Sequence, residues 1–234
     1  MQMKEKNDLF DYGFYIYQNK NYFKFSLDSL LLGEFVDLKD NYRILDMCTG
    51  NVPIPLLLMS KNKNLKIVGV ELQEQVANLA KESVSVNKLD KSIRIENVNI
   101  RDYKTSKKFD VVVCNPPYFK VDETSLINDN EIKRKARHET DITLGEIVTC
   151  AKKNLKNKGT FYIVHRTERI VELIKYLDNN GFGITKMCYI YTKENNPAKL
   201  VLIKAELSKK SYVKTYYLNI SNKKTYKGIF EKEV

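Results

Sequence analysis

The 234-residue chain has no tryptophan, two histidines and nine glycines, and several familiar motifs are missing from it. No Gly-x-Gly-x-x-Gly segment is present, which disfavours a nicotinamide-dependent oxidoreductase. The four cysteines, Cys48, Cys114, Cys150 and Cys188, form no CxxC pair, so the spacing of a zinc site is absent. We therefore expect no metal, and free thiols in a reducing compartment.

Long hydrophobic runs are also missing. No apolar stretch approaches the roughly 20 residues that cross a bilayer. Residues 1–8 contain no apolar signal region either. Together with the free thiols, these observations predict a cytoplasmic protein without a membrane partner.

Charge is abundant and unevenly distributed. The net charge is +11. Residues 1–118 carry 17 Lys and Arg against 15 Asp and Glu, whereas residues 119–234 carry 23 against 14. Compositional bias toward lysine is an alternative, but bias alone would not favour one half of the chain. The asymmetry indicates that one side of the molecule meets a polyanion such as nucleic acid.

The central motif is Asn115-Pro116-Pro117-Tyr118, which follows the valine-rich run at 109–114. The run predicts a buried strand, and the prolines end it because they cannot donate to a ladder. The Asn115 side-chain oxygen and the Pro116 carbonyl could accept from an exocyclic amine, and Tyr118 could stack on a flat ring. On this stretch alone, a strand end that merely contains prolines is an equal alternative.

Acidic residues follow three earlier predicted strands, at 43–47, 66–71 and 92–98. Asp46 precedes a small-residue loop, Cys48-Thr49-Gly50-Asn51, and a helix start, where backbone N–H groups face a ligand. Glu71 could accept both hydroxyls of a ribose, and Asp102 could accept from an amine such as that of adenine. Because ligands bind outside the carboxyl ends of such strands, the pattern predicts a nucleotide-type pocket. Each acid taken singly could be a solvated strand end.

The N-terminal segment alternates aromatic residues around a polar turn at 18–21, which predicts a β-hairpin with arms at 14–17 and 22–25. Ser26 or Asp28 then caps a short helix through 29–33. We expect this segment to form a lid over one end of the core and to complete the ligand pocket.

The second half contains a basic cluster at 133–138 ahead of a helix expected over about 142–157, with Thr140 or Asp141 as its cap. Positive charge at a helix start is unfavourable, so the cluster invites an anionic partner, although a solvated helix start is an alternative. A strand at 159–164 leads to His165 and Arg166. The segments 183–191 and 198–206 form an antiparallel pair, and the tail from 208 is either a terminal strand or an RNA-facing arm.

Taken together, these features resemble the amino-methyltransferases that use S-adenosylmethionine, whose Asn-Pro-Pro-Tyr motif matches at 115–118. Within that group the chain is most similar to the bacterial family that makes N6-methyladenine at position 37 of valine tRNA. The similarity rests on residues 25–32, 46–51, 115–118 and 136–139 and covers roughly residues 10–207.

The resemblance implies a Rossmann-like α/β fold of the class I methyltransferases. Its seven-stranded sheet is parallel except for the last strand and has helices on both faces. We expect a single domain over 1–234, divided into a hairpin and lid helix (1–40), a catalytic core (41–207) and a basic tail (208–234). The implied cofactor is S-adenosylmethionine, and the implied partner is the anticodon stem-loop of a tRNA. The protein is expected to be a monomer or weak dimer.

The resemblance also assigns roles to residues. The catalytic residues are Asn115, Pro116, Pro117 and Tyr118. The cofactor-binding residues are Ser26, Asp28, Asp46, Cys48, Thr49, Gly50, Asn51, Glu71, Leu72, Asn99, Ile100, Asp102 and Asn115. The RNA-binding residues are Lys133, Arg134, Lys135, Arg137, His138 and Arg166. The chain departs from the glycine-rich pattern at Cys48 and Val52, which puts the cofactor-loop contacts in question.

Four other functions are compatible with the motif. Related enzymes methylate guanine N2 in rRNA, adenine N6 in DNA or glutamine in proteins. The basic second half speaks against a protein substrate. A catalytically silent RNA-binding protein is the alternative outside the enzymes, and it predicts no cofactor binding.

Overall fold

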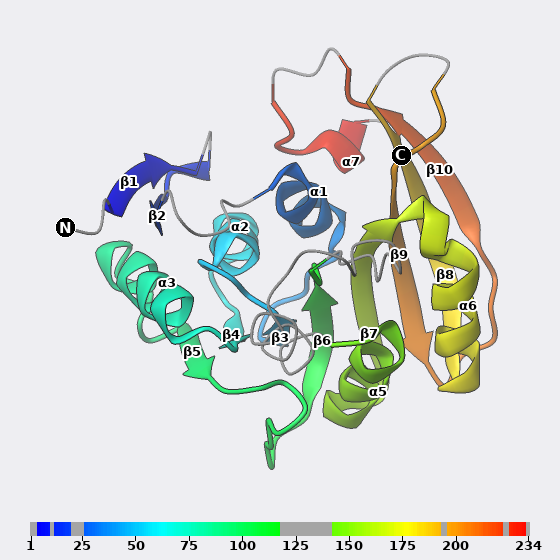
Figure 1. Cartoon of the computed structure of the whole chain (residues 1–234), viewed down its shortest axis with the longest axis horizontal. Helices are drawn as coiled ribbons and strands as arrows, with labels where there is room; N and C mark the ends of the chain where they lie inside the picture. Colours follow the sequence, from blue (N-terminus) through cyan, green and yellow to red (C-terminus); the bar gives the residue numbers. More distant parts are fainter. Residues whose placement is uncertain are drawn as a thin grey trace, which may run out of the picture.

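The computed structural model describes residues 4–9, 12–19, 26–117, 142–192, 196–221 and 225–232. In this part of the chain a large sheet lies between two layers of helices (Figure 1). The strands are β1 (Lys4–Asp8), β2 (Tyr15–Asn19), β3 (Arg43–Met47), β4 (Lys66–Glu71), β5 (Ile93–Asn97), β6 (Phe109–Cys114), β7 (Leu155–Arg166), β8 (Phe182–Tyr191), β9 (Leu200–Leu207) and β10 (Lys214–Asn219). The helices are α1 (Leu27–Phe35), α2 (Pro53–Lys61), α3 (Glu74–Val86), α5 (Leu144–Asn154), η3 (Thr167–Arg169), α6 (Ile170–Asn179) and α7 (Ile229–Lys232).

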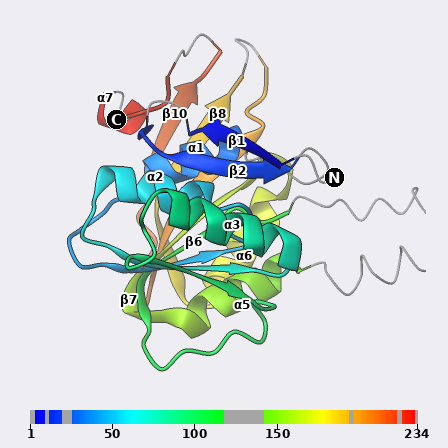
Figure 2. The same cartoon turned by 90° about the vertical axis from the view of Figure 1, so that its left-hand side faces the viewer.

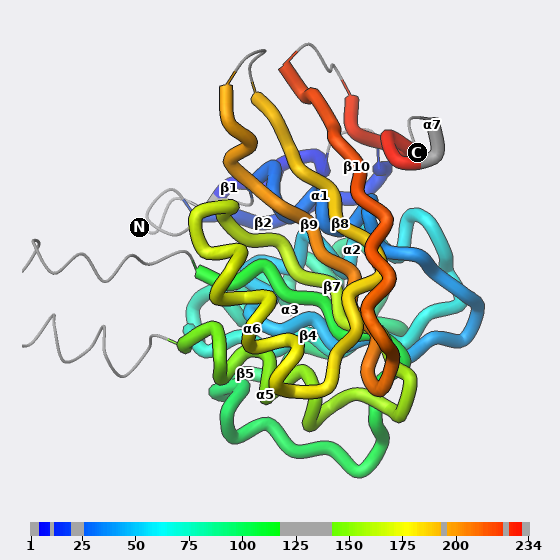
Figure 3. The backbone as a smooth tube through the Cα atoms, turned by 90° about the vertical axis from the view of Figure 1, so that its right-hand side faces the viewer, coloured from blue at the N-terminus to red at the C-terminus, as the bar shows by residue number. Residues whose placement is uncertain are grey.

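The main sheet has the strand order β10-β8-β9-β7-β6-β3-β4-β5. All its pairings are parallel except those of β9, which is antiparallel to both β7 and β8. Strands β3 to β9 therefore confirm the expected class I arrangement. β10 adds an eighth strand, parallel to β8, at the edge seen in Figure 3. Of the two readings of the tail, the terminal strand is confirmed.

Two apolar cores hold the layers together, one on each face of the sheet. On one face α1 and α2 cover the sheet with leucine-rich surfaces, among them Leu31 and Leu57, and α3 adds smaller apolar residues such as Ala80 and Val84. On the other face α5 and α6 pack residues such as Val148 and Leu173 against it. Adjacent residues of one strand alternate between the cores, as Val111 and Val112 of β6 do. This alternation explains why the central strands are apolar on both sides.

The N-terminal hairpin is confirmed, but the arms differ from those expected. β2 contains most of the expected first arm, and its partner is β1, the earlier segment Lys4–Asp8. Residues 20–25, which include the expected second arm, lie outside the described residues. Figure 2 shows the hairpin lying along α3, where Tyr17 N donates to Ser83 Oγ at 2.8 Å.

The start of α5 corrects another expectation. Its N-cap is Thr143, not Thr140 or Asp141: Thr143 Oγ1 accepts from Glu146 N, and the Glu146 side chain accepts from Thr143 N at 2.8 Å. This reciprocal capping box satisfies two backbone donors at the helix start. The helix also ends three residues earlier than expected, because β7 begins at Leu155.

Candidate active site

The carboxyl ends of β3, β4, β5 and β6 meet at one edge of the sheet. Met47 at the end of β3 pairs with Val70 on one side and Cys114 on the other. The loops that carry Asp46, Glu71 and Asn115 therefore start side by side. The sequence motifs predicted this meeting of strand ends.

Asp46 is fully buried at the centre of this edge. Its Oδ2 accepts from Thr49 Oγ1 at 2.6 Å, and its Oδ1 has no hydrogen-bond partner among the described residues. Burial raises the pKa of Asp46 to about 8, since a desolvated carboxylate is unfavourable. A buried acceptor without a partner is suited to a donor or cationic group supplied by a ligand.

The loop after Asp46 turns in left-handed backbone conformations. Cys48, Gly50 and Val52 have φ angles of 59°, 57° and 74°. Cys48 and Val52 therefore adopt, at a steric cost, the conformation that glycine adopts freely. Cys48 and Val52, where the glycine-rich pattern has glycine, therefore still have the left-handed backbone conformation that glycine favours.

Glu71 braces this loop from β4. Its Oε2 accepts from Gly50 N and its Oε1 from Gln73 N, both at 2.9 Å. Burial raises the pKa of Glu71, and each carboxylate oxygen retains a further lone pair for a ribose hydroxyl. Gly69 lets the loop approach, because a Cβ there would lie 2.8 Å from Thr49 Oγ1.

Asn97 is a residue that the sequence did not single out. Its amide donates to the carbonyls of Glu71 and Leu72, both at 2.9 Å, and so fixes the turn after β4. Leu72 is 39% exposed and adds apolar surface at the edge. A polar residue at the end of β5 was the only signal in the sequence.

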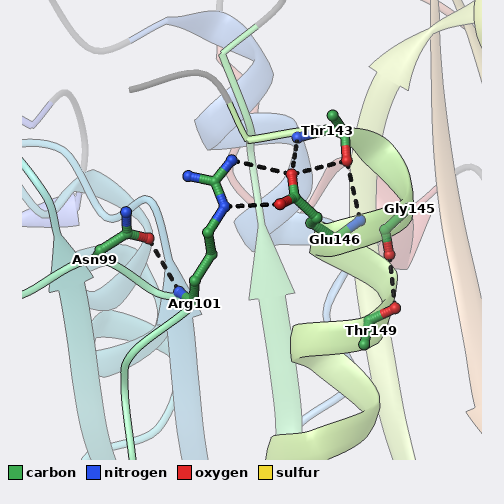
Figure 4. A network of polar contacts seen from close by, with 6 residues as sticks. All are labelled: Asn99, Arg101, Thr143, Gly145, Glu146 and Thr149. Atoms are coloured by element: carbon green, nitrogen blue, oxygen red, sulfur yellow. Dashed lines mark hydrogen bonds and ion pairs between the residues drawn. The ribbon is translucent and has the colours of Figure 1, made fainter. Parts of the chain in front are cut away.

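The loop after β5 is held by a local turn. Asn99 Oδ1 accepts from Arg101 N at 3.0 Å, and Asn99 O accepts from Asp102 N at 2.9 Å. Ile100 is buried beneath the turn and Asp102 is exposed. The Arg101 side chain leaves the loop and pairs with Glu146 of α5 (Figure 4). This contact was not expected from the sequence.

Asn115 is oriented by the N-terminal part of α1. Its Nδ2 donates to Ser29 Oγ at 2.9 Å and to Ser26 Oγ at 3.4 Å. Oδ1 is therefore the end of the amide suited to accept from a substrate amine. Pro116 is buried, Pro117 is exposed, and Asp28 is half-buried in the first turn of α1. α1 thus contacts the catalytic candidate Asn115 through Ser29, which was not among the expected site residues.

The predicted RNA-binding residues are described only in part. Arg166 is exposed at the end of β7, beside β6 and at the same sheet edge as Asn115. The catalytic candidate Tyr118 and the basic residues Lys133, Arg134, Lys135, Arg137 and His138 lie outside the described residues.

The described part of the chain shows neither a cluster of metal ligands nor a membrane-spanning helix. No group of three or more potential metal ligands gathers there. None of the described helices is long and apolar enough to cross a bilayer.

Comparison with known proteins agrees with this geometry. Residues 24–177 match the methyltransferase small domain family. A tRNA1(Val) (adenine(37)-N6)-methyltransferase from Bacteroides thetaiotaomicron is 30% identical over 81% of this chain and 79% of its own length. The protein of the same name from Actinobacillus pleuropneumoniae is 28% identical over the same shares.

Solved structures share the fold. A predicted O-methyltransferase from Agrobacterium tumefaciens superposes with a TM-score of 0.68 at 14% identity, over 88% of this chain and 94% of its own. M. jannaschii TYW2 in complex with AdoMet gives 0.62 at 16% identity, over 88% and 86%. From the matched residues, the relatives and the arrangement of strands, we conclude that this chain belongs to the methyltransferase small domain family.

Proposed function

We propose that this methyltransferase transfers a methyl group from S-adenosylmethionine to the N6 amine of an adenine in tRNA, at position 37 of valine tRNA. The observation that carries the proposal is Asn115 at the end of β6, whose amide nitrogen donates to Ser29 Oγ at 2.9 Å and so faces α1; the oxygen is the end of this amide that can accept from an amine. The names of the relatives support the choice of tRNA and of the nucleotide.

The cofactor site is assigned to the loops at the ends of β3, β4 and β5. When bound, S-adenosylmethionine supplies an electrophilic methyl group on a positively charged sulfur. Asp46, whose buried Oδ1 has no hydrogen-bond partner among the described residues, fits the charged methionine part. Glu71 fits the ribose and Asp102 fits the adenine. The three parts of the cofactor (methionine, ribose, adenine) then follow the order of β3, β4 and β5 in the sheet.

Asn115 and Pro116 are assigned to the substrate amine. The N6 lone pair of adenine is delocalised into the ring, so the amine is a poor nucleophile. Asn115 Oδ1 and the Pro116 carbonyl accept the two amino hydrogens and draw the nitrogen toward a tetrahedral shape. The lone pair is then available for attack on an electrophile. Positioning and these two hydrogen bonds supply the catalysis, and no strong general base is required.

The target base must leave its stack to reach Asn115. Tyr118 is assigned to stacking on it, a contact worth about 1–3 kcal/mol. Arg166 and the basic cluster at 133–138 are assigned to phosphates. Binding of RNA should therefore weaken steeply as salt increases.

Methyl transfer to defined RNA tests the proposal. The chain is incubated with labelled S-adenosylmethionine and either valine tRNA or the same tRNA carrying guanine at position 37, followed by nucleoside analysis. N6-methyladenosine in the first tRNA and no label in the second are expected. Equal labelling of both would refute position 37, and label in DNA or protein but not RNA would refute the substrate class.

A further inference from the structure

An ion pair joins two parts of the site edge that the sheet keeps apart. Arg101 Nε donates to Glu146 Oε1 at 2.8 Å, and Arg101 Nη2 donates to Glu146 Oε2 at 3.0 Å. This two-pronged contact, the Arg101–Glu146 clamp, is drawn in Figure 4. Bidentate contacts of this kind fix geometry as well as distance.

The clamp connects elements that lie on either side of β3 and β4. Arg101 follows β5 at the sheet edge, whereas Glu146 lies in α5, which leads into β7 beside β6. Strands β3 and β4, which carry Asp46 and Glu71, lie between β5 and β6. The clamp therefore links the two sides of the edge at which the cofactor is assigned.

Both ends of the clamp are anchored. Arg101 N donates to Asn99 Oδ1 within the turn that presents Asp102. Glu146 Oε2 also accepts from Thr143 N and from Thr143 Oγ1, both at 2.8 Å. The hydrogen bond from Arg101, together with those from Thr143, lowers the pKa of Glu146 to about 2, so the carboxylate stays charged at neutral pH.

The clamp also borders open space. Both side chains line a hollow of about 440 Å³ together with Thr149 and Lys153. A substitution at either residue therefore does not displace a fully packed core. It tests the interaction more than the packing.

We propose that Arg101 and Glu146 are positioning residues that couple the cofactor side of the site to the substrate side. This inference rests on the proposed function. The clamp fixes the Asp102 turn relative to the first turn of α5. In the chain, α5 is the first described helix after Asn115. Cofactor and RNA then bind to one prearranged edge, and each strengthens binding of the other.

Two variants and a matched control test the coupling. Glu146→Gln removes the charge but keeps a residue type that completes a capping box. Arg101→Gln removes the guanidinium. The control is Arg169→Gln, because Arg169 makes an equally short two-pronged contact with Glu172, at 2.8 and 2.7 Å, but with a residue only three positions away, where η3 runs into α6.

The dissociation constant of S-adenosylhomocysteine is measured by calorimetry with and without valine tRNA, and thermal unfolding is followed in parallel. In both clamp variants we expect about 10-fold weaker binding and loss of the strengthening by tRNA, a coupling within the usual range of roughly 5–150-fold. The double variant should be no worse than either single variant, because both remove the same contact. The control should stay within about twofold of the native protein, as expected for a partly exposed contact between residues three positions apart.

The outcomes separate this inference from the proposed function. If the native protein does not bind the cofactor product, the proposed function fails. If the native protein binds it and both clamp variants bind equally well with unchanged coupling, the clamp proposal alone is overturned. Equal loss in the Arg169→Gln control also overturns it.

Discussion

Asn115 depends on serine hydroxyls from a distant part of the chain. The contact with Ser29 links residues 86 positions apart, and Ser26 adds a longer one. Both hydroxyls accept from Nδ2, so in the observed arrangement the nitrogen end of the amide faces α1. The orientation of the amide is thus a property of α1 as much as of β6.

Replacing Asn115 with alanine should separate chemistry from cofactor binding. We expect kcat to fall by about 10²–10³-fold, as for loss of one transition-state hydrogen bond, with the cofactor dissociation constant nearly unchanged. Ser29→Ala, which leaves Asn115 present but less well oriented, should show an intermediate loss. Single-turnover kinetics and calorimetry measure the two quantities. A parallel loss of cofactor affinity in Asn115→Ala would show that the residue serves the cofactor instead.

Asp46 makes the folded state sensitive to pH. Its pKa rises from 3.8 to about 8 on folding because of burial, so the folded state holds a proton that the unfolded chain releases. The stability linked to this proton is present below pH 3.8 and is lost as the pH rises toward 8. Asp46→Asn does not titrate, so its unfolding free energy should exceed that of the native protein by about 2–5 kcal/mol at pH 8.5.

Urea unfolding between pH 4 and 8.5 measures this difference, which should shrink toward zero at the acidic end. At pH 8.5, cofactor binding by Asp46→Asn should be weaker despite the greater stability, because the carboxylate that would pair with the cofactor is gone. Parallel stability curves for the two proteins would mean that Asp46 is already ionised in the folded state.

At the scale of elements, α1 is held in place by a lysine from the neighbouring helix. Lys61 Nζ, at the end of α2, donates to the carbonyls of Gly33, Glu34 and Val36 at 3.2, 2.8 and 3.2 Å. These carbonyls lie at the end of α1, where helical partners are missing and negative partial charge accumulates. The helix has no basic residue of its own in its last turn.

Lys61→Met should therefore weaken both the fold and the site. The aliphatic stem is kept, but three carbonyls lose a charged donor, so we expect about 1–3 kcal/mol of destabilisation. Because α1 carries Ser29, kcat should fall as well. Chemical unfolding and steady-state kinetics check both effects. Lys63→Met, on the exposed turn after α2, is the control and should leave both quantities unchanged.

The central elements could be predicted from the sequence because their signals are local. The valine run of β6 ends at two prolines, and the acids at the ends of β3 and β4 follow apolar segments. The capping box at Thr143 was also visible as Thr-x-x-Glu, but the nearby Thr140 and Asp141 were chosen instead. The start of α5 was therefore predictable but wrongly assigned.

Other features could not be predicted, because they depend on contacts between distant residues. β1 has the sequence Lys-Glu-Lys-Asn-Asp, which lacks any apolar alternation, so its pairing with β2 left no trace in the pattern. The Arg101–Glu146 pair joins residues 45 positions apart on two elements. The direction of β10 was equally open, since an edge strand with exposed side chains can pair either way.

For the whole molecule, the tail is part of the core and not a mere appendage. Leu218 of β10, Ile220 just after it and Ile229 of α7 are 3%, 6% and 4% exposed and join the core on the α1 side of the sheet. The backbone of Lys209 also lies against Gly183, where a Cβ would be 2.1 Å from the Lys209 carbonyl oxygen.

Removal of residues 209–234 should accordingly destabilise the whole protein. Loss of three buried aliphatic side chains at about 1.5–3 kcal/mol each predicts a loss of roughly 5 kcal/mol. Thermal or urea unfolding of the truncated chain measures it. Tyr212→Ser, at a position that is 76% exposed, should change the unfolding free energy by less than about 0.5 kcal/mol. Unchanged stability of the truncated chain would show that β10 and α7 do not contribute to the stability of the core.

The C-terminal segment packs against α1. Glu34 Oε2 accepts from Gly228 N at 3.1 Å, across 194 positions, and the rings of Phe35 and Phe230 lie 5.3 Å apart. At 5–20 residues per second, translation takes roughly 10–40 s to pass from one partner to the other. A chain still being synthesised therefore holds the helix of Ser29 without this cover until residues 228–230 have been made.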